Sequence, residues 1–393
     1  VRDFAQAEIA PRVREIDTAE RIPTEILKGM ADIGLLAPLV GEDYGGVGAN
    51  WMMTAIAAEE LGRADISLAV PVLFLVEAAW GFILDRYGTH ELKENVLPRV
   101  VKGQNFLGIA TTEPGGGTDI LGACRTRAEK KDGAFLLNGE KVFISGVRES
   151  LDWGGVHLTL ARTNPDPAAG HKAFTFIALP LKGTAGITPT FFDDMGRMGI
   201  STGGFSLEDV RVPGHQQVGE FNRGFYHAME GFSAARTLIG ATCVGAAQAV
   251  LDMGKEHITQ REAFGRPLAS FEGIQFPLAD LHAELEGVRL STYKAAWTMD
   301  QMYEEQQATH YDIALAAAIA KLRAPKIGFE VMNEVANGFG AMAYTKELPV
   351  EMAIRGIRSY SIGAEGTVNV MRLIIARELL GGDFLPTSYV RNA

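Results

Sequence analysis

The stretch "AFLLNGEKVFIS", residues 134–145, decides the fold class, because its pattern of apolar residues differs from the helical pattern before and after the middle region. Apolar runs flank the pair Asn138-Gly139, and such a pair predicts a tight turn that joins two antiparallel strands. Two further segments, "GVHLTLAR" (155–162) and "GFSLEDVRVP" (204–213), alternate apolar and polar residues. This period of two is typical of half-buried strands and indicates a β domain in the middle of the chain.

On both sides of this β region the apolar period is helical. The segments 51–64 and 67–87 before it are long and apolar, and after it apolar residues recur every three or four positions along 274–288. Several long helices with short breaks pack most simply as a bundle. The sequence therefore predicts three parts: an N-terminal helical domain (1–105), a middle β domain (106–215) and a C-terminal helical bundle (216–393).

Composition excludes several classes of protein. The chain has 393 residues, is 47% apolar and carries a net charge of −11, which argues against a nucleic acid or an anionic membrane as partner. Its two cysteines, Cys124 and Cys243, are too few for a disulfide framework or a cysteine-rich metal cluster, and we expect no metal. No uninterrupted apolar run reaches the roughly 18 residues of a membrane span. A helical pattern is already under way at Val1, so we expect the natural chain to begin earlier.

Three short motifs point to other functions but lack the required context. "GISTG" (199–203) fits a serine nucleophile motif around Ser201, yet a strand pattern follows it where a helix is needed. "GFGAMA" (338–343) fits a dinucleotide fingerprint but follows a helical pattern instead of a strand. His282 and Glu284 form an H-x-E that has no P-C-x-x-C partner, which excludes a zinc deaminase.

Other motifs suit a planar ligand that carries phosphates. Three glycines in "ATTEPGGGTDI" (110–120) expose backbone N–H groups beside the hydroxyls of Thr112 and Thr118, although alone this stretch also fits a flexible turn. Phe143 stands two positions before Ser145, so we expect a ring and a hydroxyl on one strand face. Arg261 and Phe264 offer a phosphate partner near a stacking ring, although either alone more often serves surface charge or core packing.

The order of five segments resembles the acyl-CoA dehydrogenase family, from about Asp3 to Leu380. These segments are "TTEPGGGTD" (111–119), "NGEKVFISG" (138–146), "LEDVRVP" (207–213), "REAFGRPLASFE" (261–272) and "EGTVNVMR" (365–372). The resemblance implies a fold that is mainly α with a central β-barrel, and an FAD-dependent oxidoreductase that desaturates an acyl-CoA thioester. It also implies cofactor contacts at Thr112, Thr118, Phe143, Ser145, Arg261, Phe264, Glu334, Val335, Gly338, Thr367 and Asn369.

The catalytic base that the resemblance implies is Glu365, which removes the α-proton while N5 of the flavin accepts the β-hydride. Some family members carry the base immediately before the arginine that Arg236 matches, but that position is Ala235. A solvated glutamate at a helix end is the competing interpretation of Glu365. Arg236 matches an arginine near the CoA entrance, and Ser233 stands where an aspartate is often found.

Residues around the base indicate which kind of acyl group the site accepts. Ala364 precedes the base where straight-chain relatives often have tyrosine, Gly366 follows it, and Glu77 lies on the helix that lines the acyl cavity in relatives. We expect a branched, cyclic or bulky acyl group. Val70 stands near the position of the arginine that marks glutaryl-CoA specificity, which disfavours a dicarboxylate.

The resemblance further implies an electron-transfer flavoprotein as acceptor, a homotetramer, and the bacterial cytoplasm, or the mitochondrial matrix in a eukaryote. Glu272, Glu334 and Asn337 depart from the family pattern, and a carboxylate near FAD phosphates is unfavourable unless it points away. Two alternatives stay open: a flavin oxidase or monooxygenase on the same fold, and a non-catalytic helical scaffold.

Overall fold

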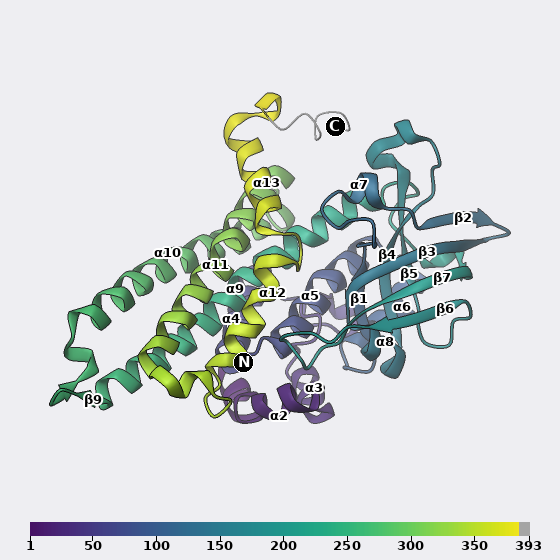
Figure 1. Cartoon of the computed structure of the whole chain (residues 1–393). Helices are drawn as coiled ribbons and strands as arrows, with labels where there is room; N and C mark the ends of the chain where they lie inside the picture. The colour runs from purple at the N-terminus through teal and green to yellow at the C-terminus, as the bar shows by residue number, and fades with distance from the viewer. Residues whose placement is uncertain (385–393) are drawn as a thin grey trace.

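A computed structural model describes residues 1–384 and has the three parts that the sequence predicts. The N-terminal helices pack beside the long C-terminal helices, while the strands gather at the other end (Figure 1). Apart from short π and 3₁₀ segments, the N-terminal helices are α1 (Arg2–Phe4), α2 (Val13–Ala19), α3 (Thr24–Asp32), α4 (Trp51–Ala64), α5 (Ala69–Tyr87) and α6 (His90–Val100).

The middle region forms an eight-stranded sheet in the order β6-β7-β3-β2-β4-β5-β8, with β1 paired in parallel to β4. Side chains from its strands, among them Phe135, Ile177 and Phe205, enclose a separate apolar core. The strands are β1 (Phe106–Ala110), β2 (Arg127–Lys131), β3 (Ala134–Ser145), β4 (Gly155–Arg162), β5 (Phe174–Leu179), β6 (Ile187–Phe191), β7 (Thr202–Pro213) and β8 (Gln217–Val218), with short helices α7 (Ile120–Ala123) and α8 (Val147–Trp153) between them.

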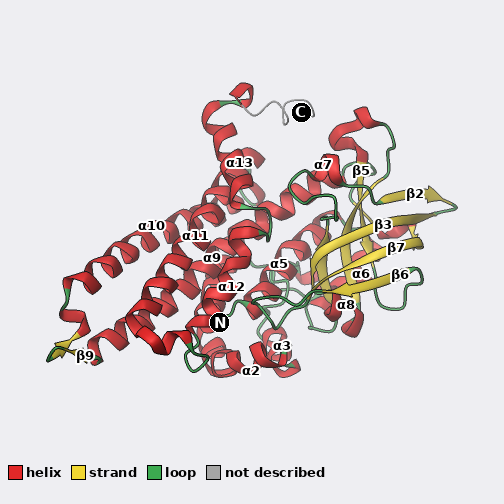
Figure 2. Ribbon diagram, viewed as in Figure 1, coloured by secondary structure: helices red, strands yellow, loops and turns green. Residues whose placement is uncertain are grey.

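The C-terminal region is helical apart from one small hairpin, β9 (Glu262–Ala263) and β10 (Arg266–Pro267). Figure 2 shows this hairpin at the far end of the molecule from the sheet. The helices are α9 (Gly224–Gln260), α10 (Glu272–Tyr303), α11 (His310–Phe339), α12 (Val350–Ile362) and α13 (Val368–Leu380).

The prediction of a turn at Asn138-Gly139 is wrong. β3 runs straight through both residues as one strand, and its register against β7 shifts between Leu137 and Gly139. The Asn138 side chain exchanges hydrogen bonds with Asp209 on β7, at 2.9 and 3.0 Å. A Cβ at Gly139 would lie 2.6 Å from the Cα of Thr126, so glycine is needed there for a bulge and a close backbone approach.

Helix α9 is long and apolar enough to cross a membrane by length and composition alone. Its apolar stretch is mostly buried inside the protein, where α9 packs against α4, α5, α10 and α11. It is therefore the central core helix of the molecule, a role that the sequence analysis did not single out.

Candidate active site

Glu365 lies in the turn between α12 and α13, and the backbone there is strained. The φ of Glu365 is +54°, a left-handed conformation that non-glycine residues rarely adopt, and the φ of Gly366 is +96°. The Thr367 side chain accepts a hydrogen bond from the Val370 N–H and so begins α13. Strain of this kind persists only where the surrounding structure holds it, and it is frequent at functional sites.

Two buried cations hold this turn by its carbonyl groups. Arg236 on α9 donates from Nε to the carbonyl oxygen of Glu365 at 2.8 Å, and Lys321 on α11 donates from Nζ to the carbonyl oxygen of Gly366. None of residues 1–384 donates a hydrogen bond to the carboxylate of Glu365 itself. The turn is thus fixed while the carboxylate stays available.

Burial raises the pKa of Glu365 to about 7, although the charges of Arg236, Lys321 and Arg197 each lower it. Burial lowers the pKa of Lys321 to about 7, aided by the nearby charge of Arg236. Burial also lowers the pKa of Arg236, to about 10, and Glu365 opposes this shift. A carboxyl group with a pKa near 7 is a much stronger base than an ordinary glutamate, and at neutral pH a large fraction of it is ionised.

The β side of the site is built around the end of β3. Phe143 forms a second bulge with φ +57°, is 66% exposed, and stacks on Phe192 with ring centroids 5.0 Å apart. The carbonyl of Thr112 accepts the Val142 N–H at 3.0 Å, so the glycine-rich segment lies beside this bulge. The structure therefore brings Thr112, Phe143 and Ser145 together, while Thr118 stands exposed further along the same segment.

A buried ion pair anchors the glycine-rich segment to the strand. Glu113 accepts hydrogen bonds from Lys141 at 2.7 Å and from the backbone N–H groups of Arg125 and Thr126 at 2.5 and 3.0 Å. Burial alone would raise the pKa of Glu113, but the charge and hydrogen bond of Lys141, together with the other donors, outweigh it and lower the pKa. This carboxylate is structural, and it holds Thr112 in place.

The loop between β6 and β7 connects the β side to the turn of Glu365. Phe192, which stacks on Phe143, begins this loop, and Arg197 in the same loop lies over the ring of Tyr360 on α12 at 5.9 Å. A Cβ at Gly196 would lie 2.5 Å from the backbone carbon of Arg355, so loop and helix pack closely. The β6–β7 loop therefore contacts both the bulge of Phe143 and helix α12, which leads into the turn of Glu365.

The remaining predicted cofactor residues lie elsewhere. Arg261 and Phe264 belong to the β9–β10 hairpin, where Phe264 is 96% exposed with φ +53°. Glu334, Val335 and Gly338 line a cavity of about 230 Å³ between α9, α10 and α11. The hairpin lies at the opposite end of the molecule from the sheet (Figure 1), so one chain does not bring both groups to one ligand.

The other predicted residues are placed as follows. Asn369 is exposed and accepts a hydrogen bond from Arg372, and Ala364 donates its N–H to Ser359 in the turn. Ser233 is buried and donates to the Met229 carbonyl. Arg236 is only 6% exposed, which supports a role beside the carboxylate; its contact with CoA phosphates stays a prediction.

Glu77 on α5 is 1% exposed, and its Oε2 has no hydrogen-bond partner among the described residues. Burial raises its pKa well above the ordinary value of a glutamate, which favours the protonated form of this carboxyl group. One turn further along α5, the indole Nε1 of Trp80 is also buried without a partner. The ring of Trp80 lies 5.6 Å from that of Phe232, over which Arg236 sits at 5.6 Å.

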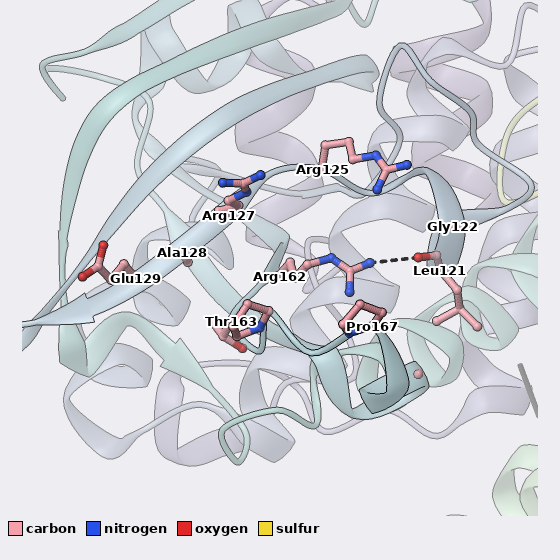
Figure 3. A pocket seen from close by; sticks show the side chains of 11 residues that line it. Leu121, Gly122, Arg125, Arg127, Ala128, Glu129, Arg162, Thr163 and Pro167 are labelled. Carbon is pink, nitrogen blue, oxygen red and sulfur yellow. Dashed lines mark hydrogen bonds between the residues drawn. The ribbon is translucent and has the colours of Figure 1, made fainter.

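A larger cavity of about 620 Å³ lies between α7, β2 and the turn after β4, and three arginines line it (Figure 3). Arg162 is held by the Leu121 carbonyl at 2.9 Å and lies over the ring of Phe174. Arg125 and Arg127 form no ion pair within the described residues. An anionic ligand would find two unpaired guanidinium groups there.

The structure also rejects the competing motifs. Ser201 donates its hydroxyl to Glu149 at 2.6 Å and accepts the Arg148 N–H, so it is a structural residue. The segment 338–343 follows a helix, as the sequence predicts. Within residues 1–384 no cluster of histidine, cysteine or acidic side chains could hold a metal ion.

Sequence reasoning missed Lys321, Arg197, Glu113 and Lys141. A lone lysine in the alanine-rich stretch "AAAIAKLRA" (316–324) was an available signal for Lys321. No local pattern marks the pairing of Glu113 with Lys141, because the two residues are 28 positions apart and meet only when the glycine-rich segment packs beside β3.

Comparison with known proteins shows the family. The models of the acyl-CoA dehydrogenase N-terminal, middle and C-terminal domains match residues 1–104, 108–210 and 222–380. This chain therefore belongs to the acyl-CoA dehydrogenase family. It is an FAD-dependent oxidoreductase that acts on a CH–CH bond, and the predicted mainly α fold with a central β domain is confirmed.

Three similar proteins illustrate this membership. The chain is 33% identical to a 3-(aryl)acrylate reductase of Clostridium sporogenes (strain ATCC 15579), over 96% of each chain. It is also 33% identical to the cyclohex-1-ene-1-carbonyl-CoA dehydrogenase of Syntrophus aciditrophicus (strain SB), over 97% of this chain and 88% of the relative. The structure of butyryl-CoA dehydrogenase from Megasphaera elsdenii superposes with a TM-score of 0.85 at 30% identity, covering 96% of this chain and 95% of that one.

Proposed function

We propose that this protein catalyses α,β-dehydrogenation of an acyl-CoA thioester, with Glu365 as the base that removes the α-proton. One observation carries the proposal: a carboxylate with a pKa of about 7 stands in a strained turn, and cations bind the carbonyls of this turn instead of the carboxylate. A base must not be tied up by hydrogen bonds before it meets its substrate.

The chain's own residues supply three effects. Burial makes the carboxylate of Glu365 more basic, and general-base assistance typically contributes about 10²–10⁴-fold to a rate. Arg236 and Lys321 orient the turn so that proton removal needs little rearrangement. After transfer the proton stays on the side chain of Glu365, whose neutral form suits a buried site.

FAD, when bound, supplies the acceptor for the β-hydride. The residues present fit it: Phe143 offers an exposed ring on a bulge, next to the hydroxyl of Ser145. Thr202, which pairs with Ser145 across the strands, has a buried Oγ1 without a partner. We assign Thr112, Thr118, Phe143, Ser145, Thr367 and Asn369 to one end of FAD.

The other end of FAD requires a second copy of the chain. The β9–β10 hairpin, which carries Phe264 and follows Arg261, lies at the far end of the molecule from the sheet that carries Phe143 (Figure 1). A neighbouring subunit would bring its hairpin to the flavin, which supports the proposed homotetramer. The side chain of Asn337 donates to Glu334 at 3.4 Å, so this carboxylate has a partner within its own helix.

The arginine-lined cavity is our candidate site for the CoA nucleotide. Arg125 and Arg127 are exposed and unpaired within the described residues, and they suit phosphate groups. The turn beside the cavity packs through His171 on Phe225, in the first turn of the helix that carries Arg236. A ligand in the cavity could therefore extend along α9 toward Glu365.

The acyl group in this proposal is branched, cyclic or bulky. Ala364, with a single methyl group as its side chain, precedes the base where the resemblance places a tyrosine in straight-chain relatives. Two relatives at 33% identity are named for an aryl-substituted acrylate and for a cyclohexenyl ring. The proposed acceptor is an electron-transfer flavoprotein, and the proposed compartment is the bacterial cytoplasm or the mitochondrial matrix.

The test is anaerobic bleaching of the flavin absorbance by butyryl-CoA, isobutyryl-CoA, cyclohex-1-ene-1-carbonyl-CoA and 3-phenylpropionyl-CoA. We expect bleaching by a bulky thioester, and a loss of about 10²–10⁴-fold in its rate in Glu365→Gln. The matched control is Glu305→Gln, an exposed position outside the site.

Each contrary result has a distinct meaning. Best turnover with butyryl-CoA would reject the bulky acyl group, and full activity of Glu365→Gln would reject the base. Rapid reoxidation of the reduced flavin by air would favour an oxidase or monooxygenase. A colourless protein that takes up no FAD would favour the non-catalytic scaffold.

A further inference from the structure

Lys321 is a buried cation without an acidic partner. It is 0% exposed in the middle of α11, and no described carboxylate lies within ion-pairing distance of its Nζ. Taking an ammonium group out of water is costly unless it is paired or used. Its bond to the Gly366 carbonyl is therefore the feature that explains its place in the core.

The geometry around Lys321 fixes two successive peptide groups. Arg236 from α9 binds the Glu365 carbonyl at 2.8 Å, and Lys321 from α11 binds the next carbonyl along the chain. Because each peptide group is planar, holding its carbonyl oxygen fixes the orientation of the whole unit. Gly366 packs directly under Arg236, since a Cβ there would lie 3.4 Å from Nη2.

We infer that Lys321 is a positioning residue, which together with Arg236 clamps the 365–366 and 366–367 peptide groups and holds the carboxylate of Glu365 toward the substrate. The inference rests on the proposed role of Glu365 as base. Lys321 does not touch the reacting atoms; it acts through the Gly366 carbonyl. The left-handed φ of Glu365 is the strain that this clamp sustains.

The charged and titratable groups that face Lys321 come from different elements. Arg236 and Cys243 lie on α9, and Glu365 lies in the α12–α13 turn. Arg197, from the β6–β7 loop, acts on Glu365 as well. Removing the charge of Lys321 removes one of the influences that lower the pKa of Glu365, so the acid limb of the activity profile should move to higher pH.

The experiment compares Lys321→Met with Lys326→Met in FAD-loaded enzyme. Lys326 is exposed on the same helix, in a loose i,i+4 pair with Glu330, and serves as matched control. For Lys321→Met we expect kcat with isobutyryl-CoA to fall about 10–100-fold, because a small misplacement of a reacting group can cost about 10²-fold. KM should change less than about threefold, and the acid limb should move to higher pH.

A second readout does not depend on activity. Amide hydrogen exchange of residues 364–368 should accelerate about tenfold or more in Lys321→Met and stay unchanged in Lys326→Met. If Lys321→Met yields no folded holoenzyme, Lys321→Leu, which also removes the donor, gives the same readouts: exchange faster than wild type supports the clamp, and unchanged exchange overturns it.

If Lys321 only stabilises the bundle, Lys321→Met would lower the melting temperature and leave kcat, the pH profile and the exchange of the turn unchanged. That result would overturn the inference. Failure of the proposed function is seen separately, because the wild-type enzyme would then not be bleached by any thioester of the panel.

Discussion

Two glutamates in different parts of the molecule lie near cations, and their pKa values are shifted in opposite directions. Glu113 in the middle domain is bonded by Lys141 and by two backbone N–H groups, and its pKa is lowered. Glu365 in the C-terminal domain lies near Arg236, Lys321 and Arg197, yet its pKa is raised to about 7. Proximity to positive charge therefore does not determine the state of a carboxylate.

The difference lies in which oxygen atoms the cations bind. Around Glu113 the donors point at the carboxylate, which stabilises its charged form. Around Glu365, Arg236 and Lys321 donate to backbone carbonyls, so burial prevails at the carboxylate. Glu77 is a third case: its Oε2 has no partner among the described residues, no nearby charge offsets burial, and burial raises its pKa well above the ordinary value. The first glutamate holds a loop, the second is free to react, and burial favours the protonated form of the third.

The largest effect expected from this comparison is on stability. Glu113→Gln would leave Lys141 buried without its counter-ion, and breaking such a pair costs about 3–5 kcal/mol. Urea unfolding of the holoenzyme should show this loss, while Glu305→Gln should stay within about 0.5 kcal/mol of wild type. A loss below about 1 kcal/mol for Glu113→Gln would mean that the backbone donors alone satisfy the site.

The sequence allowed the three-part fold and the family to be predicted, because helical and strand periods and five ordered motifs are local features. The role of Glu365 as base stays a prediction. Most helices in 51–87 and 272–380 fall where the apolar stripes indicate. The prediction of a turn at Asn138-Gly139 failed for a physical reason. The close approach of Thr126 and the pairing with β7 favour a bulge over a hairpin.

The charges around the site could not be predicted in the same way. Lys321, Arg236 and Arg197 come from α11, α9 and the β6–β7 loop, and their convergence on Glu365 is a property of the tertiary structure. Likewise, the sequence did not indicate that Nε of Arg236 binds a backbone carbonyl, and its contact with CoA phosphates stays a prediction. Residue type predicted a cation correctly, and only the fold shows which oxygen it binds.

A second prediction tests the free state of Glu365. If its ionised form is the base, kcat/KM with isobutyryl-CoA should fall about tenfold for each pH unit below about 7 and level off above it. From the plateau at high pH to pH 5.5 the loss would be about 30-fold, or about 2 kcal/mol. A flat profile down to pH 5.5 would show that the carboxylate is bonded as Glu113 is, and the contrast between the two glutamates would fail.

The smallest effect concerns Glu77 and separates burial from charge. Its raised pKa means that the folded protein keeps a proton that the unfolded chain releases above a pH of about 4.5. The unfolded state then binds fewer protons than the folded state, so the free energy of unfolding falls as pH rises. Between the unfolded and the folded pKa this fall is at most about 1.4 kcal/mol for each pH unit. Glu77→Gln keeps the shape of the side chain and removes the titrating proton, so the free energy of unfolding relative to wild type should increase from about pH 5 to about pH 6, just above the unfolded pKa. Urea unfolding at both pH values measures this difference, with Glu305→Gln as control. A difference that stays constant with pH would mean that Glu77 is ionised in the folded protein and has a partner, which would place it beside Glu113 in this comparison.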